Sequence, residues 1–180
     1  MLPIRDDHPL KLLFTGLVEH AFQAELGICD PALSDYVADL LIEFVHVDQP
    51  LIAKGTEGQP VSELAEILRQ LEAGADEPQR VRDRRVHQRI GDFTLFWAGV
   101  FPEGVRRSPG PAWRDRISEY VVCGKRSYAI ASELTQPAED PPADLLKRLS
   151  DDFEFCVHGL GIVRRELGEQ QTAGDGDLIY

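Results

Sequence analysis

Five arginines lie close together in one predicted helix: Arg80, Arg82, Arg84, Arg85 and Arg89. Spacings of three and four residues place Arg82, Arg85 and Arg89 on one face. Asp92 is expected to hold Arg89 across one turn, which would leave Arg85 free for an external anion. The cluster therefore predicts a largely exposed basic face that docks an acidic protein segment or a phosphate. The alternative is that acidic residues of neighbouring helices pair with these arginines, and such surface pairs stabilise a fold little.

Glu43 and His46 form the pattern closest to a metal site, because Glu-x-x-His places a carboxylate and an imidazole one helical turn apart. Helical di-iron proteins need this pattern twice, together with two more inward carboxylates, and here it occurs once. A rotation of about 100° per residue also turns His46 away from the apolar stripe of its helix. We therefore favour a solvated helix face, as for Glu154 and His158, and expect neither a metal nor a cofactor.

Five glycines fall inside predicted helices, where each costs about 1 kcal/mol relative to alanine. They are Gly91, Gly99, Gly124, Gly159 and Gly161. Close helix crossings are the favoured explanation. The functional alternative is a small pocket between the last three helices, lined by Trp97, Tyr120, Cys123 and Tyr128. The only basic residues close to Cys123 in the sequence are Lys125 and Arg126. The sequence therefore gives weak support for the Cys123 thiol as a nucleophile.

Sharp catalytic motifs are missing from the sequence. It contains no glycine-rich phosphate loop, no Gly-x-Ser-x-Gly, no His-Glu-x-x-His and no Cys-x-x-Cys. The three cysteines are odd in number and far apart, which favours a reducing compartment and predicts a cytoplasmic protein. No catalytic residue can be named, and whether the chain is an enzyme stays open.

One stretch resembles a known group of proteins. His87 to Pro102 reads HQRIGDFTLFWAGVFP, and it is followed by Tyr120, Gly124 and Tyr128 at intervals of four. This pattern resembles a set of uncharacterised bacterial helical proteins, over about residues 18–131. The resemblance implies a bacterial, cytoplasmic, all-helical protein. It implies no activity and no site residue, because these relatives have no established activity.

The elements that must position these residues are helices, because apolar residues recur at helical spacing and no strand pattern is evident. Asp30 is the expected N-cap of the second helix and Pro31 its first helical residue, and Gly27 is expected to end the first helix. We predict an all-α, bundle-like or orthogonal array of about six helices over residues 9–26, 31 to the connection that begins at 48, 62–73, 76–101, 113–134 and 143–168.

The predicted domain covers residues 1–168, and residues 169–180 are expected to form a mobile acidic tail. Trp97 lies on the main stripe of the fourth helix and should be buried. The last helix carries a second apolar stripe at Phe155 and Ile162. This stripe is either buried on its second side, which we favour, or covered by another chain.

Composition limits the partners. A net charge of −12 argues against general nucleic-acid binding, although residues 80–126 hold eleven basic and five acidic side chains. The longest apolar stretch is too short to span a bilayer. Two functions are compatible with this composition and these motifs. The first is a non-enzymatic binding or accessory protein, with a protein partner or a second copy. The alternative is a helical enzyme or sensor that binds a metal, haem or small ligand.

Overall fold

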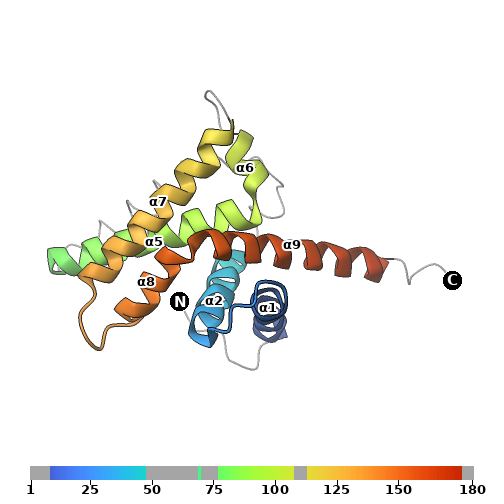
Figure 1. Cartoon of the computed structure of the whole chain (residues 1–180), viewed down its shortest axis with the longest axis horizontal. Helices are drawn as coiled ribbons and strands as arrows, with labels where there is room; N and C mark the ends of the chain where they lie inside the picture. The colour runs from blue at the N-terminus through green and yellow to red at the C-terminus, as the bar shows by residue number, and fades with distance from the viewer. Residues whose placement is uncertain (1–8, 48–68, 70–76, 108–112, 176–180) are drawn as a thin grey trace.

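The computed structural model describes residues 9–47, 69, 77–107 and 113–175, and these residues form an all-α structure without a strand (Figure 1). The helices are α1 (Pro9–Glu19), the π-helical turn η1 (His20–Glu25), α2 (Pro31–Val47), α5 (Gln79–Val100), α6 (Pro102–Arg107), α7 (Trp113–Leu134), α8 (Ala143–Asp151) and α9 (Phe153–Asp175). The predicted fold class is therefore confirmed. The helix expected over 62–73 lies outside the described residues, apart from Arg69.

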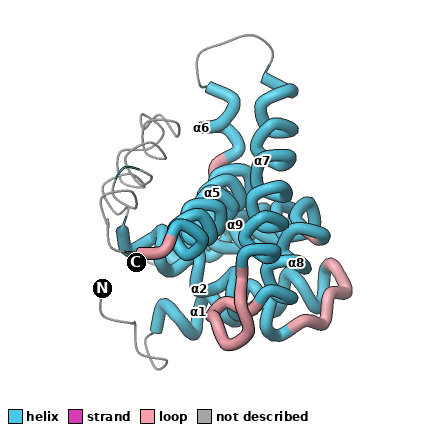
Figure 2. The backbone as a smooth tube through the Cα atoms, turned by 90° about the vertical axis from the view of Figure 1, so that its left-hand side faces the viewer, coloured by secondary structure: helices cyan, strands magenta, loops and turns pink. Residues whose placement is uncertain are grey.

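Helices α5 and α7 form the most extensive packing pair, and α9 also packs on α5 (Figures 1 and 2). α8 packs on α7, while α1 and α2 pack on each other. α2 also reaches both α5 and α8. The described helices cross at several angles, so the arrangement is closer to an orthogonal array than to a parallel bundle.

The N-terminal helices start and stop where their local chemistry predicts. Gly27 follows η1 with a positive φ of 70°, a conformation that glycine adopts without strain. Asp30 caps α2, because the Leu33 backbone N–H donates to Asp30 Oδ1 at 3.2 Å. These two signals fix the short connection from which α2 departs.

The C-terminal half differs from the prediction in three places. The expected loop after Val100 contains α6, because Pro102 takes the first helical position, where a missing N–H costs nothing. The expected single last helix is broken at Asp152, which gives α8 and α9. Finally, α9 continues to Asp175 instead of ending at Gly168, since the Glu and Gln residues that follow favour helix.

Four of the five helical glycines lie at close helix crossings, as favoured. A Cβ atom would come within 2.7 Å of the Tyr128 ring at Gly91, within 2.5 Å of Leu160 at Gly99, within 2.2 Å of Phe153 at Gly124 and within 2.4 Å of Phe22 at Gly159. At Gly161 the nearest atom would be 3.9 Å away, so packing does not require that glycine. The helices therefore approach most closely where the side chain is smallest.

The core is apolar and includes Trp97, whose predicted burial is confirmed at 8% exposure. The two residues of the second apolar stripe of α9 differ in exposure, because Ile162 is buried and Phe155 is 56% exposed. None of the described helices combines the length and the apolar character that crossing a membrane requires.

Candidate ligand-binding site

A buried aspartate joins three helices, α2, α5 and α7. Asp92 lies on α5, in the segment that is apolar nearly all round, and is only 7% exposed. The Tyr36 hydroxyl of α2 donates to its Oδ1 at 2.6 Å, and the Tyr128 hydroxyl of α7 donates to the same oxygen at 2.7 Å. We call Tyr36, Asp92 and Tyr128 the tyrosine–aspartate triad.

The local sequence explains how the triad assembles. Gly91 lets the Tyr128 ring lie directly against α5, one residue from Asp92. Tyr36 lies on the inward stripe of α2, and its ring meets the Tyr128 ring edge-on at a centroid distance of 6.4 Å. Gln88, one turn before Asp92, donates its amide N–H to the Tyr36 hydroxyl oxygen at 3.1 Å. Each hydroxyl thus has a defined orientation.

Burial dominates the electrostatics of the triad. Desolvation raises the pKa of Asp92 from 3.8 to about 6, although the two hydroxyl groups and Arg89 act in the opposite direction. Burial and the Asp92 charge raise the pKa of both Tyr36 and Tyr128, so their hydroxyls remain protonated donors. At neutral pH the site therefore holds a buried carboxylate between two neutral phenols.

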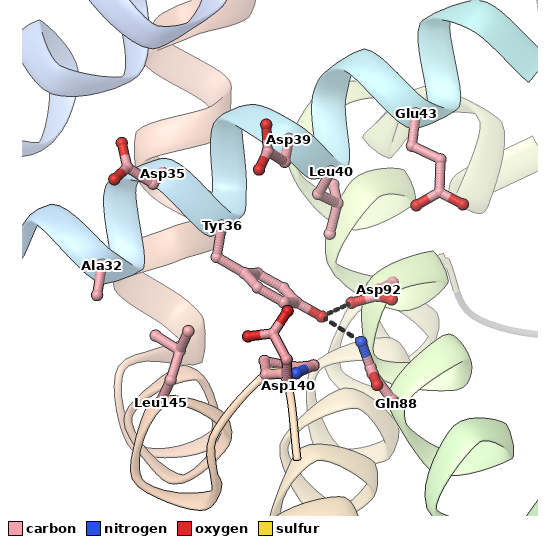
Figure 3. A pocket seen from close by; sticks show the side chains of 11 residues that line it. Ala32, Asp35, Tyr36, Asp39, Leu40, Glu43, Gln88, Asp92, Asp140 and Leu145 are labelled. Atoms are coloured by element: carbon pink, nitrogen blue, oxygen red, sulfur yellow. Dashed lines mark hydrogen bonds between the residues drawn. The ribbon is translucent and has the colours of Figure 1, made fainter. Parts of the chain in front are cut away.

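A cleft of about 470 Å³ opens beside the triad. Figure 3 shows Tyr36 reaching across it from α2 toward Asp92 and Gln88 on α5. The side chains that line the cleft are Ala32, Asp35, Tyr36, Asp39, Leu40, Glu43, Gln88, Asp92, Asp140, Pro141 and Leu145. Its volume lies within the range typical of small-molecule sites.

The triad uses only one oxygen of Asp92. Both tyrosine hydroxyls donate to Oδ1, and no described residue donates a hydrogen bond to Oδ2. Asp92 is itself one of the residues that line the cleft. One carboxylate oxygen is therefore left for a bound molecule.

Two arginines of the predicted cluster hold the loop that closes one side of the cleft. Arg84 is 6% exposed; its Nε donates to Thr135 Oγ1 at 2.8 Å and its Nη2 donates to the Pro141 carbonyl at 2.9 Å. Arg80 pairs with Glu139 through two hydrogen bonds, of 2.8 and 3.0 Å, which hold the pKa of Glu139 at about 2. These contacts fix the loop that carries Asp140 and Pro141.

The arginines of the expected basic face on α5 largely form ion pairs with acidic residues of the same molecule. Arg85 binds Glu77 and Arg89 binds Glu43, each at 2.7 Å, and none of Arg82, Arg85 and Arg89 is largely exposed. The predictions of exposure, of a free Arg85 and of an Arg89–Asp92 pair are therefore wrong. The reason is that α2 brings Glu43 to Arg89, whereas Asp92 turns toward the tyrosines. Docking of an acidic partner there stays a prediction, without the free arginine on which it relied.

The four predicted pocket residues do not meet in one pocket. Trp97 packs against Phe93, Phe96 and Phe101 in the core, and Tyr128 belongs to the triad. Tyr120 is partly buried. Cys123 is exposed on α7, where it lines a separate groove between α5 and α7. Tyr128 is fully buried whereas Cys123, five residues earlier on α7, is exposed, so these two side chains do not share one site.

The sequence interpretation missed Tyr36, Gln88 and Asp140 as site residues and assigned Asp92 to a surface ion pair. One signal was present, because Asp92 is the only charged residue between Ile90 and Phe101. A charge in such a segment is expected to have buried polar partners.

No group of three or more metal-binding side chains is placed to hold a metal ion in the described part of the chain, and the side chain of His46 lies outside it. Glu154, the other carboxylate considered, pairs with Lys125 at 2.8 Å. Comparisons with protein-family models, curated proteins and solved structures found no match. The resemblance to uncharacterised bacterial proteins therefore stays a prediction.

Proposed function

We propose that this chain is a helical binding protein for a small molecule, which occupies the cleft beside the tyrosine–aspartate triad. The observation that carries the proposal is Asp92, a buried carboxylate that lines the cleft, accepts both tyrosine hydroxyls at Oδ1 and has no described donor at Oδ2. Convergent polar groups that line a cleft of this size are typical of small-molecule sites.

A purely structural role accounts for the triad less well. Two tyrosine hydroxyls could link α2, α5 and α7 through a neutral acceptor, without a charge that burial disfavours. The buried charge of Asp92 and the adjoining cleft together favour a ligand.

A blocking substitution tests the proposal. Ala32 is exposed at the edge of the cleft, so Ala32→Trp should fill it without disturbing the core, whereas Ala24→Trp places the same side chain on an exposed position of η1 outside the cleft. We expect compounds from a small-molecule panel to shift the amide NMR signals of Tyr36, Gln88 and Asp92 in the wild type and in Ala24→Trp, but not in Ala32→Trp. Equal binding to both variants, or no response at these residues, would contradict the proposal.

A further inference from the structure

The cleft beside the triad is acidic. Five carboxylate side chains line it, from Asp35, Asp39, Glu43, Asp92 and Asp140, and no lysine or arginine does. Two of them have cationic partners outside the lining, because Arg89 binds Glu43 at 2.7 Å and Lys11 binds Asp39 at 3.3 Å. The other three make no ion pair with a described residue. The cleft therefore attracts positive charge.

Among the five carboxylates that line the cleft, Asp92 is the buried one. The hydroxyls of Tyr36 and Tyr128 both donate to Asp92 Oδ1, and Gln88 donates to Tyr36. Oδ2 belongs to a side chain more than nine-tenths buried and receives no donor from the described residues. A buried carboxylate is stabilised most by a donor that carries a positive charge.

The side walls favour an organic ion over a metal ion. Ala32, Leu40, Pro141 and Leu145 supply apolar surface around the acidic groups. A divalent metal ion needs several carboxylates converging on one point, and no such group of three occurs among the described side chains. An organic cation needs only one or two carboxylates at its charged end and apolar surface along its body.

We propose that the ligand of this cleft is a small organic cation, such as a protonated amine, whose N–H group donates to Asp92 Oδ2. This inference rests on the proposed function, because it names the class of ligand for the same cleft. Asp140 approaches from the α7–α8 loop and supplies the second carboxylate (Figure 3). The apolar body of the ligand lies against Leu40 and Leu145.

Three compounds of nearly equal shape test the charge requirement: benzylamine, benzyl alcohol and benzoate. In NMR titrations at neutral pH we expect benzylamine to shift the signals of Tyr36, Gln88 and Asp92 saturably, and benzoate to leave them unchanged. Benzyl alcohol should bind at least tenfold more weakly than benzylamine, since it lacks the charge. Asp92→Asn keeps an oxygen that can accept both tyrosine hydroxyls and should weaken benzylamine binding at least tenfold.

Asp151→Asn is the matched control, because it removes the same charge from an exposed position on α8 outside the cleft. It should bind benzylamine like the wild type. If benzyl alcohol or benzoate binds the cleft as well as benzylamine, the cation inference fails while the proposed function stands. If none of the three compounds and no member of the wider panel shifts these signals, both fail. Equal loss of binding in Asp151→Asn would show a net-charge effect only, and would overturn the role of Asp92.

Discussion

At the scale of single residues, burial and hydrogen bonding act in opposite directions on the charge of Asp92. Its burial disfavours the charge, and the two tyrosine hydroxyls and Arg89 recover only part of the lost hydration, so its pKa stays near 6. Because this pKa is above the unfolded value of 3.8, the native state holds a proton that the unfolded chain has released between these two pH values. The resulting stability is fully present below the unfolded pKa and is lost as the pH rises through about 6.

Asp92→Asn removes this titration and should change the pH dependence of stability. A rise of about two pKa units corresponds to about 3 kcal/mol. We therefore expect the free energy of unfolding of Asp92→Asn, relative to the wild type, to increase by about 2–3 kcal/mol between about pH 4 and about pH 7. Urea unfolding of both proteins measures this difference, with Asp151→Asn as the charge-matched control. Parallel curves for the wild type and Asp92→Asn would show that Asp92 is not buried as described.

At the scale of elements, the crossing of α5 and α7 depends on Gly91. An alanine there would place its Cβ 2.7–2.9 Å from three Tyr128 ring atoms, so the ring or the helix must move. We expect Gly91→Ala to destabilise the fold by about 1–3 kcal/mol, despite the better helix propensity of alanine. The control is Gly16→Ala in α1, where nothing lies within 4 Å. That variant should gain up to about 1 kcal/mol, and denaturant unfolding that ranks the two variants in the opposite order would refute the close crossing.

The α7–α8 loop is held by hydrogen bonds from Arg84. Arg84→Ala removes the donors to Thr135 Oγ1 and the Pro141 carbonyl, and unpaired buried groups of this kind cost about 1–3 kcal/mol each. We expect a loss of about 2–4 kcal/mol in the free energy of unfolding. Arg165→Ala, at an exposed position of α9, should change it by less than about 0.5 kcal/mol. A fully stable Arg84→Ala variant would rule out this role.

The helices were predictable because their inward residues repeat at helical spacing, but some of their ends were not. The inward series Leu146, Leu149, Phe153, Cys156 continues through the break at Asp152 with unchanged spacing, so periodicity alone could not separate α8 from α9. Gly168 resembles a helix stop in sequence, yet one glycine costs only about 1 kcal/mol and does not end α9.

At the scale of the whole molecule, charge that is concentrated in sequence is paired in space. The arginines of α5 meet Glu43 from α2, Glu77 before α5 and Glu139 from the α7–α8 loop. Arg89 and Glu43 are separated by 46 residues, which is why local charge patterns could not predict their pairing. For the same reason the candidate site was only partly predictable, because Tyr36, Asp92 and Asp140 are brought together by the fold and share no local motif.

The central claim is that the cleft beside Tyr36, Asp92 and Tyr128 is the ligand site of the molecule. Crystals of the protein soaked with a panel of small fragments that includes benzylamine test it most directly, because electron density locates each bound compound. We predict density in the cleft, with a donor group against Asp92 Oδ2 and the tyrosine hydroxyls still on Oδ1. Fragments that bind only elsewhere, such as in the α5–α7 groove beside Cys123, while the cleft stays empty would contradict the claim.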